Sequence, residues 1–227
     1  MKSKIDVLDH GFVRLVDSMG GDISVVRAAR VSHDAAWRSG EDQGSDERLI
    51  GYLWKNHHST PFEAVTMTFE VKAPIFIFRQ WHRHRTWSFN ELSARYRELP
   101  EEFYVPAADV IGKQSASSKQ ARDIGQGEDQ DSSNLINDAC SVAFNTYRQL
   151  LDRGVPREIA RSVLPVATYS HMFATVDLLN LLKFLTLRSH SHAQWEIQQY
   201  ADALRRLVEM VAPVSVAAWA KGMQADG

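Results

Sequence analysis

The residues from Val65 to Lys72 alternate between apolar and polar side chains: Val65, Met67, Phe69 and Val71 are interleaved with Thr66, Thr68, Glu70 and Lys72. Because side chains of a β-strand point to opposite faces in turn, this pattern predicts a strand with one buried face. Pro74 follows, and the apolar run behind it predicts a helix over 75–85 with Pro74 in its first turn. A sheet with one apolar face must be covered by other elements of the chain.

Helical spacing accounts for much of the remaining chain. It predicts helices over 22–31, 45–56, 135–154, 156–165 and 177–188, and a last long helix with apolar positions from Ile197 to Val211. Asp22 and Asp177 are expected to cap the helices that they precede, and Ser191 with Gln194 is expected to form a capping box. Strands are predicted at 11–17 and 166–176. These elements indicate a helix-rich α+β fold.

Charge and cysteine usage limit the classes of function. The chain of 227 residues has 26 basic and 28 acidic side chains, a balance that does not favour a dedicated nucleic-acid or membrane-surface protein. No apolar run approaches the roughly 20 residues of a membrane span, and the N-terminal residues lack the apolar core of a signal peptide. We therefore expect a cytoplasmic protein with neither a nucleic-acid nor a membrane partner.

Cys140 is the only cysteine, so the chain can form neither an internal disulfide nor a thiolate zinc site. It lies inside a predicted helix without a neighbouring His or Arg, which indicates packing rather than a nucleophile. The stretch 112–134 is rich in Gly, Ser, Gln and Asp, and only Ala116, Ala121 and Ile124 are apolar. It cannot bury much surface, so we predict a mobile surface loop there.

Basic side chains gather between positions 79 and 97. The segment holds Arg79, His82, Arg83, His84, Arg85, Arg95 and Arg97 against a single carboxylate, Glu91. Arginine binds phosphate oxygens in pairs, so this cluster is typical of a site for a phosphorylated ligand. On a helix, Gln80, Arg83 and His84 would share one face and Arg85 would point elsewhere, which allows two ligands or two subunits. A solvated basic face at a helix end is the alternative.

A second basic group contains Arg157, Arg161 and Arg188. Arg161 lies between Ala160 and Val163, so we expect it to emerge from an otherwise buried helix and to need an anionic partner. That partner is either a ligand or an internal carboxylate. Ser93 lacks an adjacent base, which favours a ligand-binding hydroxyl over a nucleophile.

Two other functions fit part of the pattern. His82 with His84, and His190 with His192, are spaced two apart, and such pairs diverge on a helix. Without cysteines or carboxylates at ligand spacing, we do not expect a metal site. The tryptophans at 81 and 87 flank the basic run and would suit base stacking in RNA, which the overall charge does not favour. A nucleotide- or RNA-binding protein without catalysis stays open as an alternative.

Arg83-His84-Arg85, followed after seven residues by Ser93, lies in the segment RHRTWSFNELSARY, which resembles the signature of the flavin-dependent thymidylate synthases. Four other segments resemble family segments in the same order: HSTPFE from His58, KAPIFIFRQW before the motif, GVPREIARSVLP from Gly154 and LRSHSHAQWEIQQYA from Leu187. The resemblance covers most of the chain outside 112–134. It implies a single helix-rich domain over 1–227, in which a mixed sheet is flanked by helices.

The resemblance also implies an activity. Family members transfer a methylene group from methylenetetrahydrofolate to carbon 5 of dUMP and reduce it with a hydride from FAD, which NADPH recharges. By matching position, the nucleotide-binding residues are Gln80, Arg83, Glu91, Ser93, Arg95, Arg161 and Arg188, and Arg188 is catalytic because it stabilises negative charge on the uracil. The residues assigned to FAD or folate are His58, Thr60, Arg83, His84, Arg85, Glu91, Asp177 and Lys183. Family enzymes are homotetramers with sites at subunit interfaces.

Two departures from the family pattern concern the cofactor. The family usually has Asn-Ala-Arg where this chain has Asp177-Leu178-Leu179, and Ala64 replaces a common histidine. Loss of a charged hydrogen bond to a cofactor costs roughly two orders of magnitude in affinity. An acid at position 177 would also repel a pyrophosphate unless it faced a sugar hydroxyl. A diverged member that methylates another uracil nucleotide, such as UMP, therefore stays open.

Overall fold

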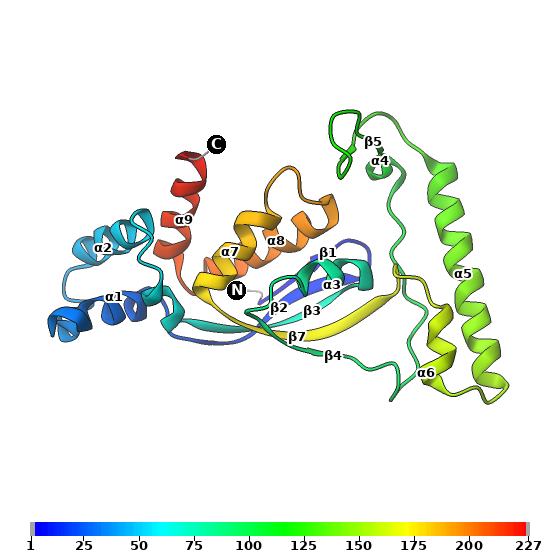
Figure 1. The fold of residues 1–227 in the computed structure, drawn as a ribbon, viewed down its shortest axis with the longest axis horizontal. Helices are drawn as coiled ribbons and strands as arrows, with labels where there is room; N and C mark the ends of the chain where they lie inside the picture. Colours follow the sequence, from blue (N-terminus) through cyan, green and yellow to red (C-terminus); the bar gives the residue numbers. More distant parts are fainter. Residues whose placement is uncertain (1–2, 226–227) are drawn as a thin grey trace.

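A five-stranded sheet lies at the centre of the computed structural model, which describes residues 3–225 (Figure 1). Its strands, in spatial order, are β1 (Lys4–Val7), β2 (Gly11–Met19), β3 (Thr66–Pro74), β7 (Tyr169–Asp177) and β4 (Ser88–Glu91). Every pairing is antiparallel. The α+β class is thus confirmed, but the sheet is not mixed. The chain leaves β3 at Pro74 and re-enters β7 at the same end, where Pro74 pairs with Tyr169.

The predicted alternation is confirmed in β3. Met67, Phe69 and Val71 are at most 1% exposed and belong to the main core. The helices α7 (Leu178–Arg188) and α8 (Trp195–Val208) cover this face of the sheet (Figure 1). On the opposite face Glu70 pairs with Arg14 and, at 2.7 Å, with His171. The sheet therefore fixes the ends of β4, β7 and α7 relative to one another.

Seven further helices lie in the described part of the chain: α1 (Asp22–Arg30), α2 (Gln43–Lys55), α3 (Ile75–Trp81), α4 (Ala108–Ile111), α5 (Gln130–Asp152), α6 (Arg157–Ala160) and α9 (Pro213–Ala225). Short 3-10 turns are η1 (Val31–His33), η2 (Ala36–Arg38), η3 (Thr60–Ala64) and η4 (Arg161–Val163). The sequence pattern did not predict α9. None of the helices within residues 3–225 is both long enough and apolar enough to cross a membrane.

The three predicted helix caps have different outcomes. Asp177 caps α7 as expected, since its Oδ1 accepts from Asn180 N at 2.9 Å. Asp22 does not cap α1, because its carboxylate accepts from the backbone N–H groups of Val214 and Ser215 and so caps α9. The Ser191–Gln194 capping box is also wrong. Gln194 directs its side-chain amide to Glu196 instead.

The helix α3 ends at Trp81, four residues before the predicted end at Arg85. Trp81 is fully buried and packs edge to face against Trp87, with ring centroids 5.8 Å apart. This contact requires the chain to turn between the two rings, so residues 83–85 are not helical. Pro74 is the last residue of β3 rather than part of a first helical turn. A turn, and not a helix, therefore sets where the side chains of residues 83–85 point.

The stretch 112–134 contains regular structure that composition did not predict. Two short strands, β5 (Lys113–Gln114) and β6 (Arg122–Asp123), pair as an antiparallel hairpin. The helix α5 begins at Gln130, five residues earlier than expected, because Asp129 caps it by accepting from Ser132 N at 2.9 Å. Only the segments between these elements fit the loop prediction.

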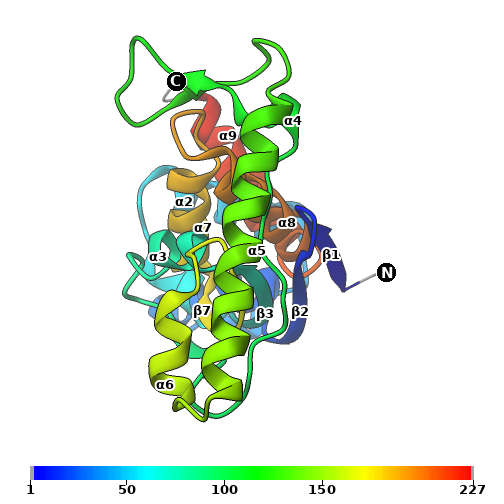
Figure 2. The same ribbon diagram turned by 90° about the vertical axis from the view of Figure 1, so that its right-hand side faces the viewer.

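A smaller second core joins α5 and α6 beside the sheet (Figure 2). It contains Phe144 and Tyr147 of α5 and Ala160 of α6. The helix α5 exposes part of the apolar stripe that sequence spacing marks as its buried side, since Leu135 is 70% and Val142 66% exposed. An apolar stripe at helical spacing thus lies on the surface of the protomer.

Candidate active site

Three of the predicted nucleotide-binding residues, Glu91, Ser93 and Arg161, line one cavity of about 360 Å³, which we call the Glu91 cavity. Glu91 is the last residue of β4, and Ser170 of β7 donates to its Oε1 at 2.7 Å. This hydrogen bond fixes the carboxylate at the cavity wall. The cavity therefore combines a held acceptor, a hydroxyl and a guanidinium.

Arg79, His82 and Ser170 also line the Glu91 cavity, although none of them was among the predicted binding residues. Arg79 and His82 share a face of the α3 segment with Ile75, at helical spacing that was visible in the sequence. The Nε2 atom of His82 is buried and has no hydrogen-bond partner in residues 3–225. No pattern in the sequence marks Ser170 as a site residue, because only the pairing of strands in the sheet brings it beside Glu91.

The surroundings of Arg161 differ from the expectation. Ile159 and Val163 are 58% and 37% exposed, so Arg161 does not emerge from a buried helix. It makes no salt bridge within residues 3–225, whereas its neighbours Arg157 and Glu158 pair with Glu98 and Arg95, at 3.4 and 3.3 Å. An internal carboxylate is thus not its partner, which favours the ligand that we considered. Arg95 lies exposed beside this helix and does not line the cavity.

A second group, which we call the Arg188 cluster, contains Gln80, His84 and Arg188. The Nε atom of Arg188 donates to His84 Nε2 at 3.1 Å, and its Nη2 atom donates to the carbonyl oxygen of Gln80 at 3.1 Å. Burial and the Arg188 charge lower the pKa of His84 to about 4, so its ring is neutral at physiological pH and Nε2 can accept. None of the three residues lines the Glu91 cavity.

Arg83, Arg85 and Lys183 line a cavity of about 460 Å³ together with His84, Thr86 and Asn180. The three cations are exposed and make no salt bridge within the described residues. Lys183 comes from α7, whereas Arg83 and Arg85 come from the turn after α3. Such a group of uncompensated cations suits an anion with several oxygens, such as a pyrophosphate.

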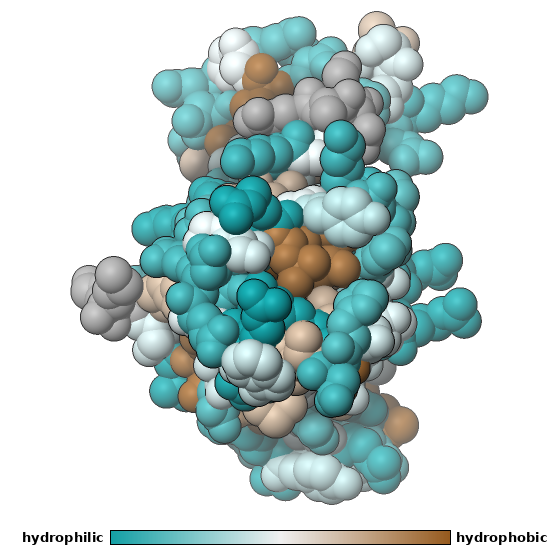
Figure 3. All heavy atoms as spheres, turned by 90° about the vertical axis from the view of Figure 1, so that its left-hand side faces the viewer, coloured by the Kyte–Doolittle hydropathy of each residue, from teal (hydrophilic) through white to brown (hydrophobic). Residues whose placement is uncertain are grey.

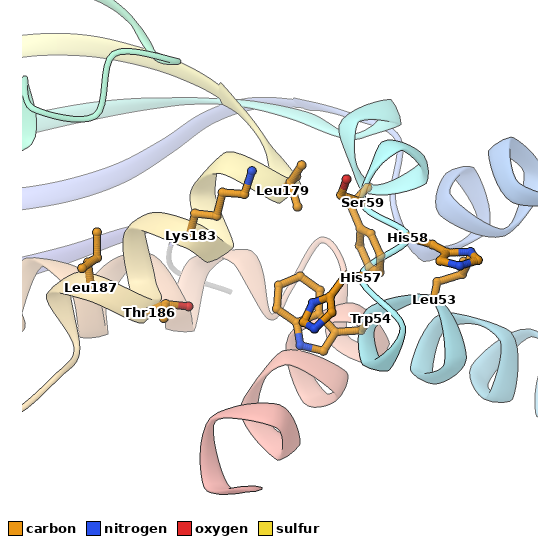
Figure 4. Close-up of a pocket in the computed structure, with 10 residues that line it drawn as sticks. Leu53, Trp54, His57, His58, Ser59, Leu179, Lys183, Thr186 and Leu187 are labelled. Atoms are coloured by element: carbon orange, nitrogen blue, oxygen red, sulfur yellow. The ribbon is translucent and has the colours of Figure 1, made fainter. Parts of the chain in front are cut away.

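Lys183 also lines a neighbouring cavity of about 610 Å³ between α7 and the connection from α2 to η3 (Figure 4). Its walls are mainly apolar and include Trp54, Phe62 and Leu179. His57 lines it as well, in the left-handed backbone conformation with φ 57°. The face at the α1–α2 end shows a central apolar patch rimmed by hydrophilic side chains (Figure 3). The cavity is suited to a flat apolar ring.

His58 and Thr60 line a larger cavity of about 1080 Å³ with Arg30 and Tyr52. His58 also borders the apolar cavity of Figure 4, so the two are neighbours. Asp177 lines none of these cavities: its two carboxylate oxygens accept from Asn180 N at 2.9 Å and from Asn180 Nδ2 at 2.6 Å. The acid is thus occupied as a cap. No group of three potential metal ligands lies within residues 3–225.

The fold and these cavities are those of a nucleotide-binding protein. The family model described as thymidylate synthase complementing protein matches residues 14–214 of the chain. The chain is 46% identical over 218 residues to the flavin-dependent thymidylate synthase of Thermotoga neapolitana, covering 96% of this chain and 94% of the relative. It is 47% identical over 215 residues to that of Thermus thermophilus, covering 95% of this chain and 77% of the relative. The chain belongs to the flavin-dependent thymidylate synthase family.

Two solved structures of PolB, a UMP/dUMP methylase from Streptomyces cacaoi, are also similar. The structure with 5-Br dUMP is 43% identical, with a TM-score of 0.86, and the match covers 96% of this chain and 97% of that one. The structure with 5-Br UMP is 41% identical, with a TM-score of 0.83, and the match covers 96% of both chains. The fold is thus shared with a relative that takes either nucleotide.

The family implies FAD as cofactor, with NADPH and methylenetetrahydrofolate as co-substrates. The residues of this structure fit that cofactor. The cavity lined by Arg83 and Arg85, which we call the cationic cavity, suits a pyrophosphate, and the cavity of Figure 4, which we call the apolar cavity, suits a flat ring. Lys183 borders both. The Asp177 charge is engaged in the α7 cap, and Leu179, which is 5% exposed, forms part of the apolar wall. The departures at Asp177 and Leu179 are therefore compatible with flavin binding.

Proposed function

We propose that the protein methylates carbon 5 of dUMP to give dTMP, with methylenetetrahydrofolate as carbon donor and NADPH as reductant of FAD. The observation that carries this proposal is the Arg188 cluster, in which a guanidinium is fixed by a motif histidine and a main-chain carbonyl. FAD, when bound, supplies the hydride that reduces the transferred carbon. Cys140 takes no part, since it is 4% exposed and burial raises the pKa of its thiol.

Arg188 acts on the uracil ring. Its Nε and Nη2 atoms are engaged with the protein, which leaves Nη1 for a ligand. A guanidinium held in place stabilises negative charge on the ring as carbon 5 becomes nucleophilic, and it does so without reorganising in the transition state. Because His84 is neutral, it orients Arg188 without repelling it.

The Glu91 cavity holds the sugar and the phosphate in this proposal. Arg161 and Ser93 donate to phosphate oxygens, and Arg95 approaches from outside the cavity after exchanging Glu158 for the ligand. Glu91 keeps an oxygen free to accept from a sugar hydroxyl, since Ser170 engages the other. Gln80 and Arg83 contact the nucleotide from the side of the Arg188 cluster.

The cofactor occupies the cationic and apolar cavities. Arg83, Arg85 and Lys183 contact its pyrophosphate, and His84 borders the same cavity. His58 and Thr60, which line the cavity of about 1080 Å³, hold the folate or the distal part of FAD. Glu91 lines the Glu91 cavity and contacts the cofactor from the nucleotide side. Asp177 contributes by starting α7, the helix that carries Lys183.

We further propose a homotetramer with shared active sites, each protomer being a single domain over 1–227 that acts in the cytoplasm. The Glu91 cavity and the Arg188 cluster share no residue and lie on different faces of the α3 segment, which supports a nucleotide site completed by a second copy. The exposed stripe of α5, with Leu135 and Val142, is an apolar surface that a neighbouring subunit would bury.

A second candidate function is methylation of UMP, favoured by the similarity to PolB. The two nucleotides differ by one ribose hydroxyl, and the Glu91 cavity is lined by further polar side chains, such as His82 and Ser93, that can receive it. We place both substrates in the same site.

The test is an anaerobic incubation of the protein with FAD, NADPH, methylenetetrahydrofolate and an equal mixture of dUMP and UMP, followed by mass spectrometry. Methylated dUMP is the expected product. Methylated UMP alone would establish the second candidate function. Folded protein that yields no product and no flavin absorbance would leave the alternative of a nucleotide- or RNA-binding protein, and a mixture without folate is the control.

A further inference from the structure

A buried carboxylate connects the 113–123 hairpin to α8. Glu196, the second residue of α8, is 1% exposed and accepts three hydrogen bonds. Arg122 Nη2 and the Tyr104 hydroxyl donate to its Oε1 at 2.7 and 3.1 Å, and Gln194 Nε2 donates to its Oε2 at 2.8 Å. We call these four side chains the Glu196 network. A carboxylate removed from water requires such partners, so the Arg122 contact is strongly favoured over an unpaired charge.

The network continues to the Arg188 cluster. Gln194 Oε1 accepts from Gln80 Nε2, and the main-chain oxygen of Gln80 accepts from Arg188. A continuous line of side chains therefore runs from Arg122 through Glu196 and Gln194 to Gln80. Its members lie far apart in sequence: Arg122 and Glu196 are separated by 74 positions, and Gln80 and Gln194 by 114.

The negative charge of Glu196 sets which atom donates and which accepts in each hydrogen bond along this line. An ionised carboxylate can only accept, so the Gln194 amide must turn its Nε2 to Glu196 and its Oε1 to Gln80. Gln80 in turn must donate from Nε2, which leaves its Oε1 as a free acceptor. The orientation of the Gln80 amide is thus fixed by a carboxylate two side chains away.

Arg122 is the charged anchor of the β5–β6 hairpin, whose strands have two residues each. Its side chain is 26% exposed, and its Nε atom is buried without a partner in the described residues. Because the hairpin contributes little apolar surface, its docking on α8 depends on the Arg122–Glu196 contact. The polar stretch 112–134, to which the reaction assigns no role, therefore contains the residue that anchors the line to Gln80.

We propose that Arg122, Glu196 and Gln194 are positioning residues of the nucleotide site. They hold the Gln80 amide in one orientation and so couple docking of the hairpin to nucleotide affinity. The inference rests on the proposed function in one respect, namely that Gln80 contacts the nucleotide. A hairpin anchor without a functional role is the competing interpretation.

Arg122→Ala in the FAD-loaded protein tests the proposal. We expect the dissociation constants of dUMP and UMP, measured by calorimetry, to rise about tenfold, because Gln80 must then be ordered at the expense of binding energy. The KM for the nucleotide rises in parallel, while kcat and FAD content stay within about twofold. Lys119→Ala is the matched control, since Lys119 is an exposed cation of the same hairpin and makes no salt bridge within residues 3–225.

A double-mutant cycle with Gln80→Ala separates the positioning role from a structural one. If Arg122 acts through Gln80, the double variant binds dUMP no more weakly than Gln80→Ala alone. Additive losses, or an unchanged dissociation constant in Arg122→Ala, overturn the proposal. So does a Gln80→Ala variant with unchanged affinity. Because binding is measured without turnover, a wild-type protein that binds dUMP but forms no product would contradict the proposed function and leave this test intact.

Discussion

The two faces of the α3 segment hold their polar groups in different ways. On the face of the Glu91 cavity, Arg79 and Arg161 make no salt bridge within the described residues, and His82 Nε2 lacks a partner. On the other face, Arg188 and Gln80 are engaged in hydrogen bonds that continue to Glu196. A polar group without a protein partner gains its hydrogen-bond or salt-bridge partner when a ligand binds. A group that the protein already holds in place stabilises charge in the transition state without reorganising. We infer that the first face governs affinity and that Arg188 on the second face governs turnover, while Gln80 on the second face contributes to nucleotide affinity.

Substitution of Arg188 is the strongest test of this division. Arg188→Ala removes the fixed positive charge that stabilises the uracil ring. We therefore expect kcat to fall by at least about a hundredfold while FAD stays bound. Steady-state kinetics and the flavin absorbance of the purified variant measure the two quantities. Arg206→Ala, an exposed arginine of α8, is the control and should keep wild-type turnover. Turnover that persists in Arg188→Ala would remove the catalytic role from this face.

Arg161→Ala should change affinity instead. Loss of a guanidinium that contacts phosphate is expected to raise the nucleotide KM by about 10- to 100-fold, with kcat changed less than about threefold. Arg157→Ala on the neighbouring helix is the matched control, because that arginine pairs with Glu98 and lines no part of the cavity. A fall in kcat without a rise in KM would reverse the roles of the two faces.

Lys183 sharpens the comparison by testing the cofactor side. It lies one helical turn after Leu179 and on the same face of α7, so it can supply the cation that the family pattern places at 179. We expect Lys183→Ala to weaken FAD binding about tenfold in a fluorescence titration. Lys55→Ala, at the exposed end of α2, should leave FAD affinity unchanged. Equal affinity in both variants would place the pyrophosphate elsewhere.

The sequence predicts elements whose determinants are local. The alternation of β3 and the Asp177 cap of α7 each depend on residues within a few positions, and both are confirmed. Asp22 shows why the other caps are wrong: its partners are Val214 and Ser215, 192 and 193 positions away. A carboxylate caps whichever helix start the fold brings to it, which spacing along the chain does not reveal.

The site follows the same rule. Residue types between 79 and 97 predict an anion site, but the end of α3 is set by the packing of Trp81 on Trp87. This turn separates Arg83 and Arg85 from the face of Arg79 and His82. The resemblance supplied the set of residues, and tertiary packing divides that set between cavities. The Glu196 network, which joins segments far apart in sequence, had no local signal at all.

The low pKa of His84 predicts a pH dependence specific to the Arg188 cluster. Between about pH 4 and 6.5 the unfolded chain binds a proton at this residue and the folded protein does not. Stability therefore rises with pH across this window, and the contribution is lost as the pH falls from 6.5 towards 4. Urea unfolding at several pH values should show a smaller slope in His84→Gln than in the wild type.

His190→Gln is the control for that measurement, because His190 is exposed and lies outside the cluster. An NMR titration of the His84 ring provides a direct check. A midpoint near 6.5 would show that the ring is neither desolvated nor held against Arg188, and the neutral acceptor assigned to Nε2 would be wrong.

Cys140 should give the smallest effect, because it touches neither face of α3. It lies on α5, buried on the same side as Phe144 and Tyr147. Burial raises the pKa of its thiol, so the thiolate that nucleophilic attack requires is scarce at neutral pH. Cys140→Ala should keep turnover within about twofold and lose about 1 kcal/mol of unfolding free energy from reduced packing. A folded variant without turnover would instead implicate the thiol, and catalysis would then lie outside both faces.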